Sequence, residues 1–461
     1  MSGPGTLDRT RPPPAEALRP LELPLFHRFR LDNGMRLLVA ESSKLPEVSL
    51  RLIIEAGASG EPADRGGVAE LTGRLLSEGA GPRSALQMAA WLDRLGAAFR
   101  ARIGYDVAHL SMHFLSDVTP GALDYLRAVV REPAFAEAEV SRVRQERLDE
   151  IERQLDQPGI LADHRFIRGV YGAHPYGRPV GGRRSTVARL GEKEVRAFHG
   201  RRYVPEGAVL IACGAVEAPA FRDAVERRFG DWAGAGSDGA LRPPQASAGP
   251  GGPILVDRRH AAQAEIRVGR IGLPYGGKDF FPATVANAIL GGLFNSRINM
   301  NLREDKGWTY GARSVFHFRR RAGPFVVSTA VESGAAAGAF REILAETEGL
   351  ATRPPEEAEL RLAKNALTLS LPRQFETPSL MTRKMVTQQV YALPEDYWET
   401  YVDRVEAVGS DEIVEVVRSH MTPESMHLVA VAAAAEVGSA LAEFGQVTVE
   451  PAEPGEEAES P

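Results

Sequence analysis

The stretch that decides the fold is Gly66–Gly79, which reads G-G-V-A-E-L-T-G-R-L-L-S-E-G. Its apolar residues recur at helical spacing between glycines, so we predict a short helix. Glu70 and Arg74 are four residues apart, in the order that favours a side-chain ion pair on one helix face. A predicted strand at Val48–Glu55, V-S-L-R-L-I-I-E, and a glycine-containing loop precede the helix. The basic unit is therefore strand, loop and helix.

The same order of elements recurs weakly in the second half of the chain. Ala264–Val268, A-E-I-R-V, resembles Val48–Leu52, and a glycine-containing loop and a small-residue helix, A-T-V-A-N-A-I-L-G-G, follow it. A predicted strand at Pro324–Ala330 and a long helix at Ala335–Leu350 extend the match. We therefore predict an α+β fold of two homologous domains, each a mixed or antiparallel sheet packed with helices and internally pseudo-repeated. Chance recurrence of this order is the alternative.

A segment rich in Gly and Pro divides the chain into halves of similar length. We predict a linker at 233–253, because A-G-A-G-S-D-G-A-L-R-P-P-Q-A-S-A-G-P-G-G-P cannot form a core. The two domains then span 23–232 and 254–448. The Pro-rich N-terminus 1–22 and the acidic tail 449–461 are predicted to be disordered. Within the first domain, Asn33-Gly34 between two alternating segments predicts a hairpin with a type I′ turn.

Composition indicates a soluble globular protein. The 461 residues are 43% hydrophobic and 25% charged, and the net charge is -6. This balance gives no reason to expect nucleic acid or an anionic membrane as a partner. The chain has no apolar run long enough for a membrane span and no apolar signal-peptide region, so we expect a cytoplasmic protein. The single cysteine, Cys213, lies in the apolar run V-L-I-A-C-G and is predicted to be a buried, inert thiol.

The strongest local signal in the second half is L-G-G-L-F-N-S-R-I-N-M-N-L-R-E-D-K-G-W-T-Y-G-A, residues 290–312. We predict a helix at Ser296–Glu304, and then a strand that begins at Trp308. This geometry can bring Arg303 and Tyr310 together, and a guanidinium and a phenol can donate hydrogen bonds to a carbonyl or an oxyanion. The alternative is that Arg303 pairs with a surface carboxylate while Tyr310 packs in the core.

Several of these segments resemble the pitrilysin/insulinase family of zinc peptidases, and most closely its two-domain bacterial and mitochondrial-processing-peptidase-like branch. The resemblance extends from about Leu23 to about Ala433. It rests on the L-D-N-G-M-R-L-L-V hairpin, the G-G-V-A helix, H-P-Y-G-R-P-V-G-G at His174–Gly182, and S-R-I-N-M-N-L-R-E-D-K-G-W-T-Y-G at Ser296–Gly311. In this family an Arg and a Tyr at this spacing contact the substrate at the zinc centre, and Arg303 and Tyr310 occupy those positions.

Active members of the family carry an H-x-x-E-H motif, whose two histidines hold zinc and whose glutamate activates a water molecule. The resemblance places the first ligand at Glu70, the base at Gly73, the second ligand at Arg74 and the third ligand at Glu150. Glycine cannot act as a base, and arginine cannot be deprotonated to bind a metal. The resemblance therefore implies a degenerate zinc site, with no catalytic residue of its own and no bound metal.

The substituted residues suggest a specific arrangement. Our hypothesis is that the Arg74 guanidinium occupies the position of the zinc ion and compensates Glu70 and Glu150. The alternative is an exposed helix pair of little energetic value. The family often has an Asn-Ala pair on its substrate-binding edge strand, where this chain has Arg100-Ala101.

Three histidines were also considered as metal ligands. His109 and His113 share one face of a predicted strand, but no third ligand stands nearby at a recognisable spacing. We therefore expect partly exposed strand histidines. His174, in the motif H-P-Y-G, is expected to form a structural turn.

The resemblance implies a function without independent catalysis. In this family the two domains form the halves of a clamshell that encloses a peptide chamber. The chain is expected to be the non-catalytic subunit of a heterodimeric zinc metalloendopeptidase, in which Arg303 and Tyr310 act in trans on a peptide or unfolded polypeptide at the zinc centre of an H-x-x-E-H partner. Two alternatives stay open: a structural or scaffold subunit of a larger complex, and a stand-alone peptide-binding chamber.

Overall fold

The computed structural model describes residues 10, 23–234, 245 and 252–452. The predicted disorder of the N-terminus, the greater part of the predicted linker and the end of the predicted tail lie outside these residues. None of the helices in the described ranges combines the length and apolar composition that a bilayer crossing requires.

The first half forms a six-stranded sheet in the order β1-β2-β6-β3-β5-β4. Its strands are β1 (Phe26–Arg30), β2 (Arg36–Glu41), β3 (Glu47–Ile54), β4 (Ala98–Ile103), β5 (Ala108–Leu115) and β6 (Val209–Gly214). Its helices are α1 (Val68–Leu75), α2 (Ala85–Arg94), α3 (Thr119–Arg131), α4 (Glu137–Leu155), α5 (Pro158–Tyr171), α6 (Arg184–Val187), α7 (Glu192–Arg202) and α8 (Ala218–Phe229).

The second half forms another six-stranded sheet, in the order β12-β7-β11-β8-β10-β9. Its strands are β7 (Ile254–Asp257), β8 (Gln263–Ile271), β9 (Ala312–Phe316), β10 (Pro324–Glu332), β11 (His427–Ala432) and β12 (Thr448–Pro451). Its helices are α9 (Phe280–Asn287), α10 (Arg297–Asn299), α11 (Ala336–Thr352), α12 (Glu357–Thr368), α13 (Pro378–Val390), α14 (Tyr401–Glu406), α15 (Ser410–His420) and α16 (Ala434–Leu441).

The two sheets share a topology, which confirms the predicted fold of two homologous α+β halves. In each sheet one inner pair is parallel, β2 with β6 and β7 with β11. The next three strands follow in antiparallel pairing, β6-β3-β5-β4 and β11-β8-β10-β9. The sixth strands differ, since β1 is antiparallel to β2 whereas β12 is parallel to β7.

Two local predictions need correction. Residues 449–451, expected to begin the disordered tail, belong to β12, because backbone pairing with β7 gives this polar segment a place in the sheet. The turn between β1 and β2 is a five-residue loop, 31–35, and not a type I′ turn. Gly34 has a positive φ of 89° but Asn33 does not, and a type I′ turn requires it at both central positions. Asn33 instead accepts a hydrogen bond from the Met35 N–H and donates one to the Phe229 carbonyl.

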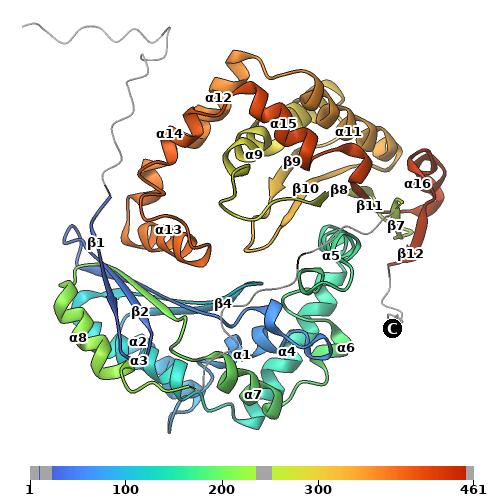
Figure 1. Cartoon of the computed structure of the whole chain (residues 1–461). Coiled ribbons are helices and arrows are strands. Elements are labelled where there is room, and N and C mark those ends of the chain that lie inside the picture. The colour runs from blue at the N-terminus through green and yellow to red at the C-terminus, as the bar shows by residue number, and fades with distance from the viewer. Residues whose placement is uncertain (1–9, 11–22, 235–244, 246–251, 453–461) are drawn as a thin grey trace, which may run out of the picture.

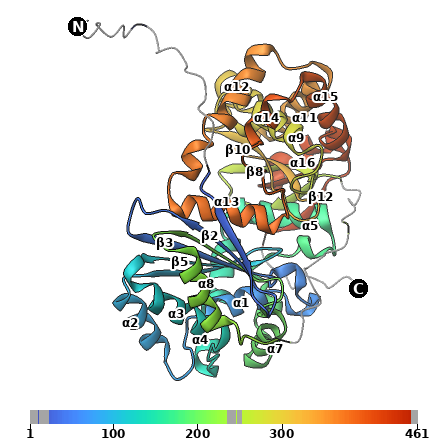
Figure 2. The same ribbon diagram turned by 60° about the vertical axis from the view of Figure 1, so that its left-hand side comes forward.

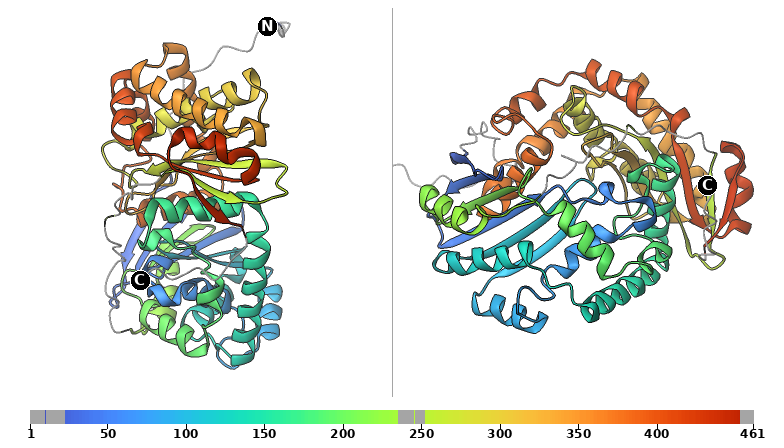
Figure 3. Two further views of the ribbon diagram at one scale, coloured as in Figure 1. Left: turned by 90° about the vertical axis from the view of Figure 1, so that its right-hand side faces the viewer. Right: turned by 60° about the horizontal axis from the view of Figure 1, so that its bottom comes forward.

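The two halves exchange helices. Helix α5 belongs to the first half but packs on β8 and β11 of the second sheet. Helix α13 belongs to the second half but packs on β3 and β6 of the first sheet. Figures 1 and 2 show α13, in orange, lying against the first sheet and α5, in blue-green, lying against the second. The other helices of each half lie on the opposite face of its sheet (Figure 3). We call the face that receives the exchanged helix the inner face.

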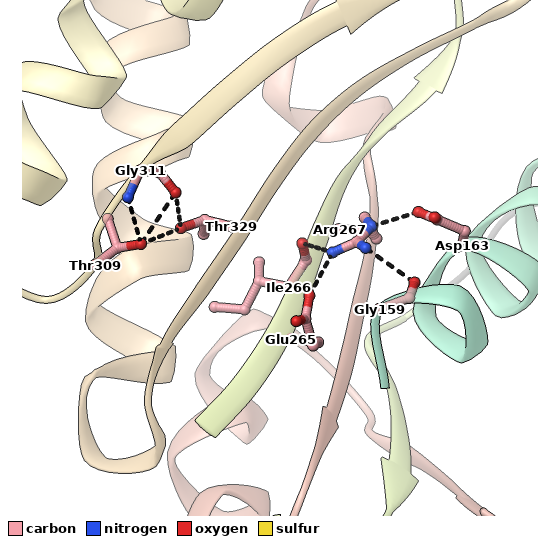
Figure 4. Close-up of polar contacts among 8 residues, drawn as sticks. All are labelled: Gly159, Asp163, Glu265, Ile266, Arg267, Thr309, Gly311 and Thr329. Atoms are coloured by element: carbon pink, nitrogen blue, oxygen red, sulfur yellow. Dashed lines mark hydrogen bonds and ion pairs between the residues drawn. The ribbon is translucent and has the colours of Figure 1, made fainter. Parts of the chain in front are cut away.

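An arginine at the same place in each sheet binds the exchanged helix. Arg267 of β8 donates to the Gly159 carbonyl and to the Asp163 carboxylate of α5, at 2.9 and 2.5 Å (Figure 4). Arg51 of β3 donates to the Ser379 carbonyl and the Thr382 hydroxyl of α13, at 3.2 and 2.9 Å. The repeat that the sequence shows at A-E-I-R-V and V-S-L-R-L thus includes the residue that holds the opposite half.

A buried polar cluster joins the halves a second time. Arg320 forms a two-pronged ion pair with Glu55, at 2.5 and 2.6 Å, and its backbone N–H donates to Asp106. The Tyr176 hydroxyl donates to the same Asp106 carboxylate at 2.5 Å. The Arg319 guanidinium lies over the ring of Tyr176, 4.7 Å from its centroid. These contacts connect the first half to the loop between β9 and β10.

Candidate functional site

Helix α1 is positioned by a buried carboxylate at its N-terminus. Glu61 accepts hydrogen bonds from the backbone N–H groups of Gly67 and Ala69, at 3.1 and 2.7 Å. These are donors that a helix start leaves without intrahelical partners. Gly67 itself adopts a left-handed conformation, with φ of 95°. The apolar face of α1 packs into the core of the first half, which leaves Glu70 and Arg74 on a half-buried face toward α4.

The degenerate zinc-site residues form an ion cluster. Arg74 donates from Nε to Glu70 at 2.7 Å and from Nη2 to Glu150 of α4 at 2.7 Å. Arg147 donates to the same Glu150 carboxylate at 2.9 Å. The side chains of Arg74, Glu70 and Glu150 are 34%, 20% and 32% exposed, so the cluster is neither fully buried nor a free surface pair. It places one guanidinium between the two carboxylates.

Opposite charges in the cluster shift the pKa values of Arg74 and Glu150 in the direction that favours their ionised forms. Burial by itself would lower the pKa of Arg74, but the hydrogen bond and charge of Glu70, together with Glu150, raise this pKa above its usual value. Burial would raise the pKa of Glu150, but the hydrogen bond from Arg147 and the charge of Arg74 lower it below its usual value of 4.5. Arg74 and Glu150 are therefore ionised at neutral pH.

These residues do not fit a zinc ion. The resemblance assigns the catalytic base to Gly73, and a Cβ added there would lie 2.7 Å from Ile103 Cδ1 of β4. A larger side chain at this position would therefore require the Ile103 side chain or β4 to move. Arg74 offers only N–H donors where a ligand would offer a lone pair. Across the described part of the chain, no group of three or more His, Cys, Asp and Glu side chains is arranged to hold a metal.

The second candidate element is the segment around Arg303 and Tyr310. The predicted helix is present as α10 followed by a π-helix, Met300–Asp305. The strand predicted from Trp308 begins only at Ala312, because residues 308–311 form a separate loop. A π-helix is uncommon and is often found at functional sites.

The structure does not bring Arg303 and Tyr310 into contact. The Arg303 guanidinium lies over the ring of Phe294, 4.5 Å from its centroid, and 3.4 Å from the Glu304 carboxylate. The second contact agrees with the alternative of a surface ion pair. Tyr310 is 95% exposed, so the alternative that it packs in the core is wrong.

The loop that carries Tyr310 is held by polar contacts (Figure 4). The Thr329 hydroxyl of β10 lies 3.0 Å from the Thr309 hydroxyl and 3.1 Å from the Gly311 carbonyl oxygen. The Thr309 hydroxyl also accepts from the Gly311 N–H at 3.1 Å. On the other side, the Asn299 side chain accepts from the Ala312 N–H. The exposed phenol thus projects from a fixed loop. Sequence reasoning missed Thr329 and Asn299, because neither lies next to Tyr310 in the chain.

The remaining candidates have structural surroundings. His109 lies 3.1 Å from Arg51, and His113 pairs with Glu47 at 3.2 Å. His174 accepts from the Tyr176 N–H, within a turn. Cys213 is buried, as predicted, and burial raises the pKa of its thiol to about 12.

Comparison with known proteins agrees with this organisation. Residues 36–182 match the family model described as insulinase (peptidase family M16), and residues 189–367 match the model described as peptidase M16 inactive domain. A Mycobacterium tuberculosis protein described as an uncharacterized zinc protease is 27% identical over 410 residues, which cover 88% of this chain and 91% of the relative. A Bacillus subtilis protein with the same description is 24% identical over 290 residues, which cover 63% of this chain and 70% of the relative.

Solved structures show the same architecture over nearly the whole molecule. The crystal structure of a peptidase M16 inactive domain from Pseudomonas fluorescens superimposes with a TM-score of 0.82 at 25% identity, covering 88% of this chain and 98% of that one. A protease from Helicobacter pylori has a TM-score of 0.83 at 17% identity, covering 89% and 100%. With both of its halves matched by models of this family, this chain belongs to the insulinase family of peptidases, family M16.

Proposed function

We propose that this chain is the non-catalytic subunit of a heterodimeric zinc metalloendopeptidase. Its partner would be a homologous subunit with an intact H-x-x-E-H motif, and the zinc would belong to that partner. The observation that carries the proposal is the 95% exposure of Tyr310 on a loop held by Thr309 and Thr329. A large aromatic side chain presented in this way is typical of a surface that contacts a ligand or another protein.

The chemistry proposed for Arg303 and Tyr310 is oxyanion stabilisation. A phenol O–H and a guanidinium N–H can both donate to the oxygen of a scissile peptide carbonyl, and more strongly once that oxygen becomes negative. The partner's zinc would supply the activated water. Arg303 is one-third exposed, and its guanidinium contacts Phe294 and Glu304, so it can turn toward a bound substrate without unfolding its helix.

The proposal also includes the setting of the complex. The substrate would be a peptide or an unfolded segment, since each sheet ends in a strand with one neighbour, β4 or β9, and an extended chain can add to such a strand. A reducing compartment such as the cytoplasm is consistent with the single buried thiol, Cys213.

The test is reconstitution with a partner. The chain is co-expressed with an H-x-x-E-H homologue from the same genome, the complex is purified, and cleavage of a quenched fluorescent peptide is measured. We expect Tyr310→Phe and Arg303→Ala each to lower kcat/KM by about 10²–10³, the loss typical of one oxyanion donor. Arg222→Ala, which removes an exposed arginine paired with Asp223, is the matched control and should leave kcat/KM unchanged.

The result also separates the proposal from a scaffold role. A complex that cleaves equally fast with Tyr310→Phe and Arg303→Ala would show that neither residue acts in trans. A chain that forms a stable complex without any peptidase activity would indicate a scaffold subunit.

A further inference from the structure

Four arginines gather on the inner face of the first sheet, beside α13. Arg100 and Arg102 lie on the edge strand β4, Arg51 lies on β3, and Arg383 lies on α13; we call these four the arginine patch. Ser111 of β5 pairs in register with both Arg51 and Arg100, so these two arginines stand in one row on one face. Burial, and then the charge of Arg383, lowers the pKa of Arg51. Arg100, Arg102 and Arg383 are exposed.

The charge of the patch is not compensated. In the described ranges no carboxylate forms an ion pair with these four side chains, and Arg51 binds the Thr382 hydroxyl and His109 instead. Glu47, which lies on the same face, pairs with His113. His109 is neutral at physiological pH, because burial and the charges of Arg51 and Arg102 lower its pKa to about 4. The patch is therefore a local excess of positive charge in a chain whose net charge is -6.

The corresponding row of the second sheet differs. Ser328 pairs in register with both Arg267 and Arg313, just as Ser111 pairs with Arg51 and Arg100. There, however, Arg267 binds two carboxylates, one of them Asp163 at 2.5 Å. The central-strand arginine is thus compensated in the second sheet and not in the first, so its uncompensated charge is not a general consequence of the repeat.

The patch borders a free strand edge. Among the residues that the structure describes, strand β4 is the last strand of its sheet and pairs only with β5, so its other side offers backbone N–H and C=O groups. Along β4, Arg100 and Arg102 lie on the inner face and are exposed. The residues that alternate with them lie on the opposite face and are half-buried or buried, namely Phe99, Ala101 and Ile103. In a strand added to β4, every second side chain would lie on the same face as Arg100 and Arg102. The Cβ atoms of directly opposite residues would then be about 4.5–5.5 Å apart.

The resemblance already implies that an extended segment adds to β4, and we propose that Arg100 and Arg102 select a segment with carboxylate side chains at alternating positions. The proposal rests on the proposed function in one respect, namely that the bound segment is the substrate. Backbone hydrogen bonds along β4 supply affinity without sequence preference, and the two guanidinium groups select acidic side chains.

Charged edge strands have a second known role, which is to prevent pairing between copies of the same protein. That role accounts for Arg100 and Arg102 but not for Arg51 and Arg383, which do not lie on the edge. Prevention of pairing between copies needs a charge of either sign on the edge strand. Recognition of an acidic segment needs a positive charge. The sign of the charge therefore separates the two roles.

The experiment measures peptide binding to the isolated full-length chain at low salt, without a partner. The probes are a labelled peptide of alternating Glu and Val and its Lys and Val counterpart. We expect the Glu peptide to bind the parent chain at least tenfold more tightly than the Lys peptide. The double variant R100A/R102A should lose about three- to tenfold in affinity for the Glu peptide, and R100E/R102E should prefer the Lys peptide. R313A, on the edge strand of the second sheet, should bind as the parent does.

Several outcomes overturn the proposal. Equal binding of both peptides by the parent, or an equal loss in R313A, removes the proposed site. Self-association of R100A/R102A without a change in peptide preference assigns the arginines to edge protection. Displacement of the Glu peptide by a short single-stranded DNA at lower concentration, or by millimolar inorganic phosphate, assigns the patch to phosphate. Because no partner is present, these outcomes are independent of the Arg303 and Tyr310 cleavage test, which can fail or succeed separately.

Discussion

At the scale of single residues, the first half shows how a short helix is held by an ion cluster and a close contact. Arg74 forms ion pairs with two carboxylates, and Gly73 lets α1 approach β4 closely. With Arg147 on Glu150, the cluster has two cations and two carboxylates, so this face of α1 is balanced in charge.

Arg74→Ala should lower the free energy of unfolding by about 1–2 kcal/mol. This value lies between those of exposed and buried ion pairs, because the three side chains are 20–34% exposed. Chemical denaturation at pH 7 measures it, with Arg222→Ala as the control, for which we expect a change within about 0.5 kcal/mol. A change of that small size for Arg74→Ala would mean that the cluster contributes nothing.

The same variant has a defined pH dependence. The pKa of Glu150 is lowered in the folded state, so its contribution is present above its unfolded pKa, near 4.5, and is lost as pH falls through the lowered value. The difference in stability between parent and Arg74→Ala should therefore shrink below about pH 4.5. A difference that stays constant to pH 3 would contradict the ionic origin.

Gly73→Ala should destabilise the protein by about 1–3 kcal/mol, because the new methyl group meets Ile103. Gly200→Ala in α7 is the matched control, since a Cβ there has nothing within 4 Å. It should stabilise the protein by about 0.4–1 kcal/mol through the helix preference of alanine. Thermal unfolding of both variants distinguishes local crowding from a general effect of replacing helical glycines.

At the scale of elements, the exchanged helices α5 and α13 determine how the sheets are completed. Each lies on the inner face of the opposite sheet, and each is bound there by a central-strand arginine. The two attachments differ in charge, because Arg267 binds carboxylates whereas Arg51 binds hydroxyl and carbonyl oxygens. We therefore expect Arg267 and Arg51 to contribute unequally to the free energy of unfolding.

Arg267→Ala should lower the free energy of unfolding by about 2–4 kcal/mol, since its side chain is 7% exposed and its loss leaves Asp163 and Glu265 without their cation. Arg51→Ala should cost less, about 1–2 kcal/mol, because only neutral acceptors lose a donor. Urea denaturation of the two variants gives the comparison. Equal losses would show that the ion pairs on Arg267 add nothing to its backbone contacts.

At the scale of the whole molecule, the halves share a hydrophobic cluster, although the first half also has a cluster of its own. Inner-face residues of the first sheet, including Leu38, Ile53 and Ile211, pack in the same cluster as Met385 of α13 and residues of the second half. The polar cluster of Arg320, Glu55 and Asp106 adds a second connection. The two halves are therefore packed against each other and are not independent domains joined by a linker.

Cutting the chain between residues 244 and 245 should give two fragments that fold only together. Residues 1–244 lack α13 and residues 245–461 lack α5, so each fragment alone exposes one inner face of its sheet. Co-expressed fragments should co-elute as a one-to-one complex with a single cooperative unfolding transition. A fragment that is monomeric and unfolds cooperatively by itself would contradict the shared core.

Sequence reasoning reached those parts of the fold that depend on local pattern. The strand at 48–55, the helices near 66–79 and 335–350, and the recurrence of A-E-I-R-V all correspond to observed elements. It missed the roles of α5 and α13, because an amphipathic helix does not reveal which sheet will cover its apolar side. The prediction of a type I′ turn was wrong for a related reason. The Asn33 side chain donates to the carbonyl of Phe229, which is far away in the sequence, and local turn preferences do not include such a contact.

The sequence by itself determined the plan of two α+β halves, and it excluded Gly73 as a base and Arg74 as a metal ligand. Periodicity dictates strands and helices, and neither glycine nor arginine can replace a base and a ligand whatever the fold. Only the tertiary structure decided that Arg74 bridges Glu70 and Glu150. It also decided that Tyr310 is exposed while the Arg303 guanidinium lies over the Phe294 ring. Finally, it decided that a helix of each half packs on the sheet of the other half. These depend on contacts between segments far apart in the chain, whose partners are chosen by packing and not by neighbouring residues.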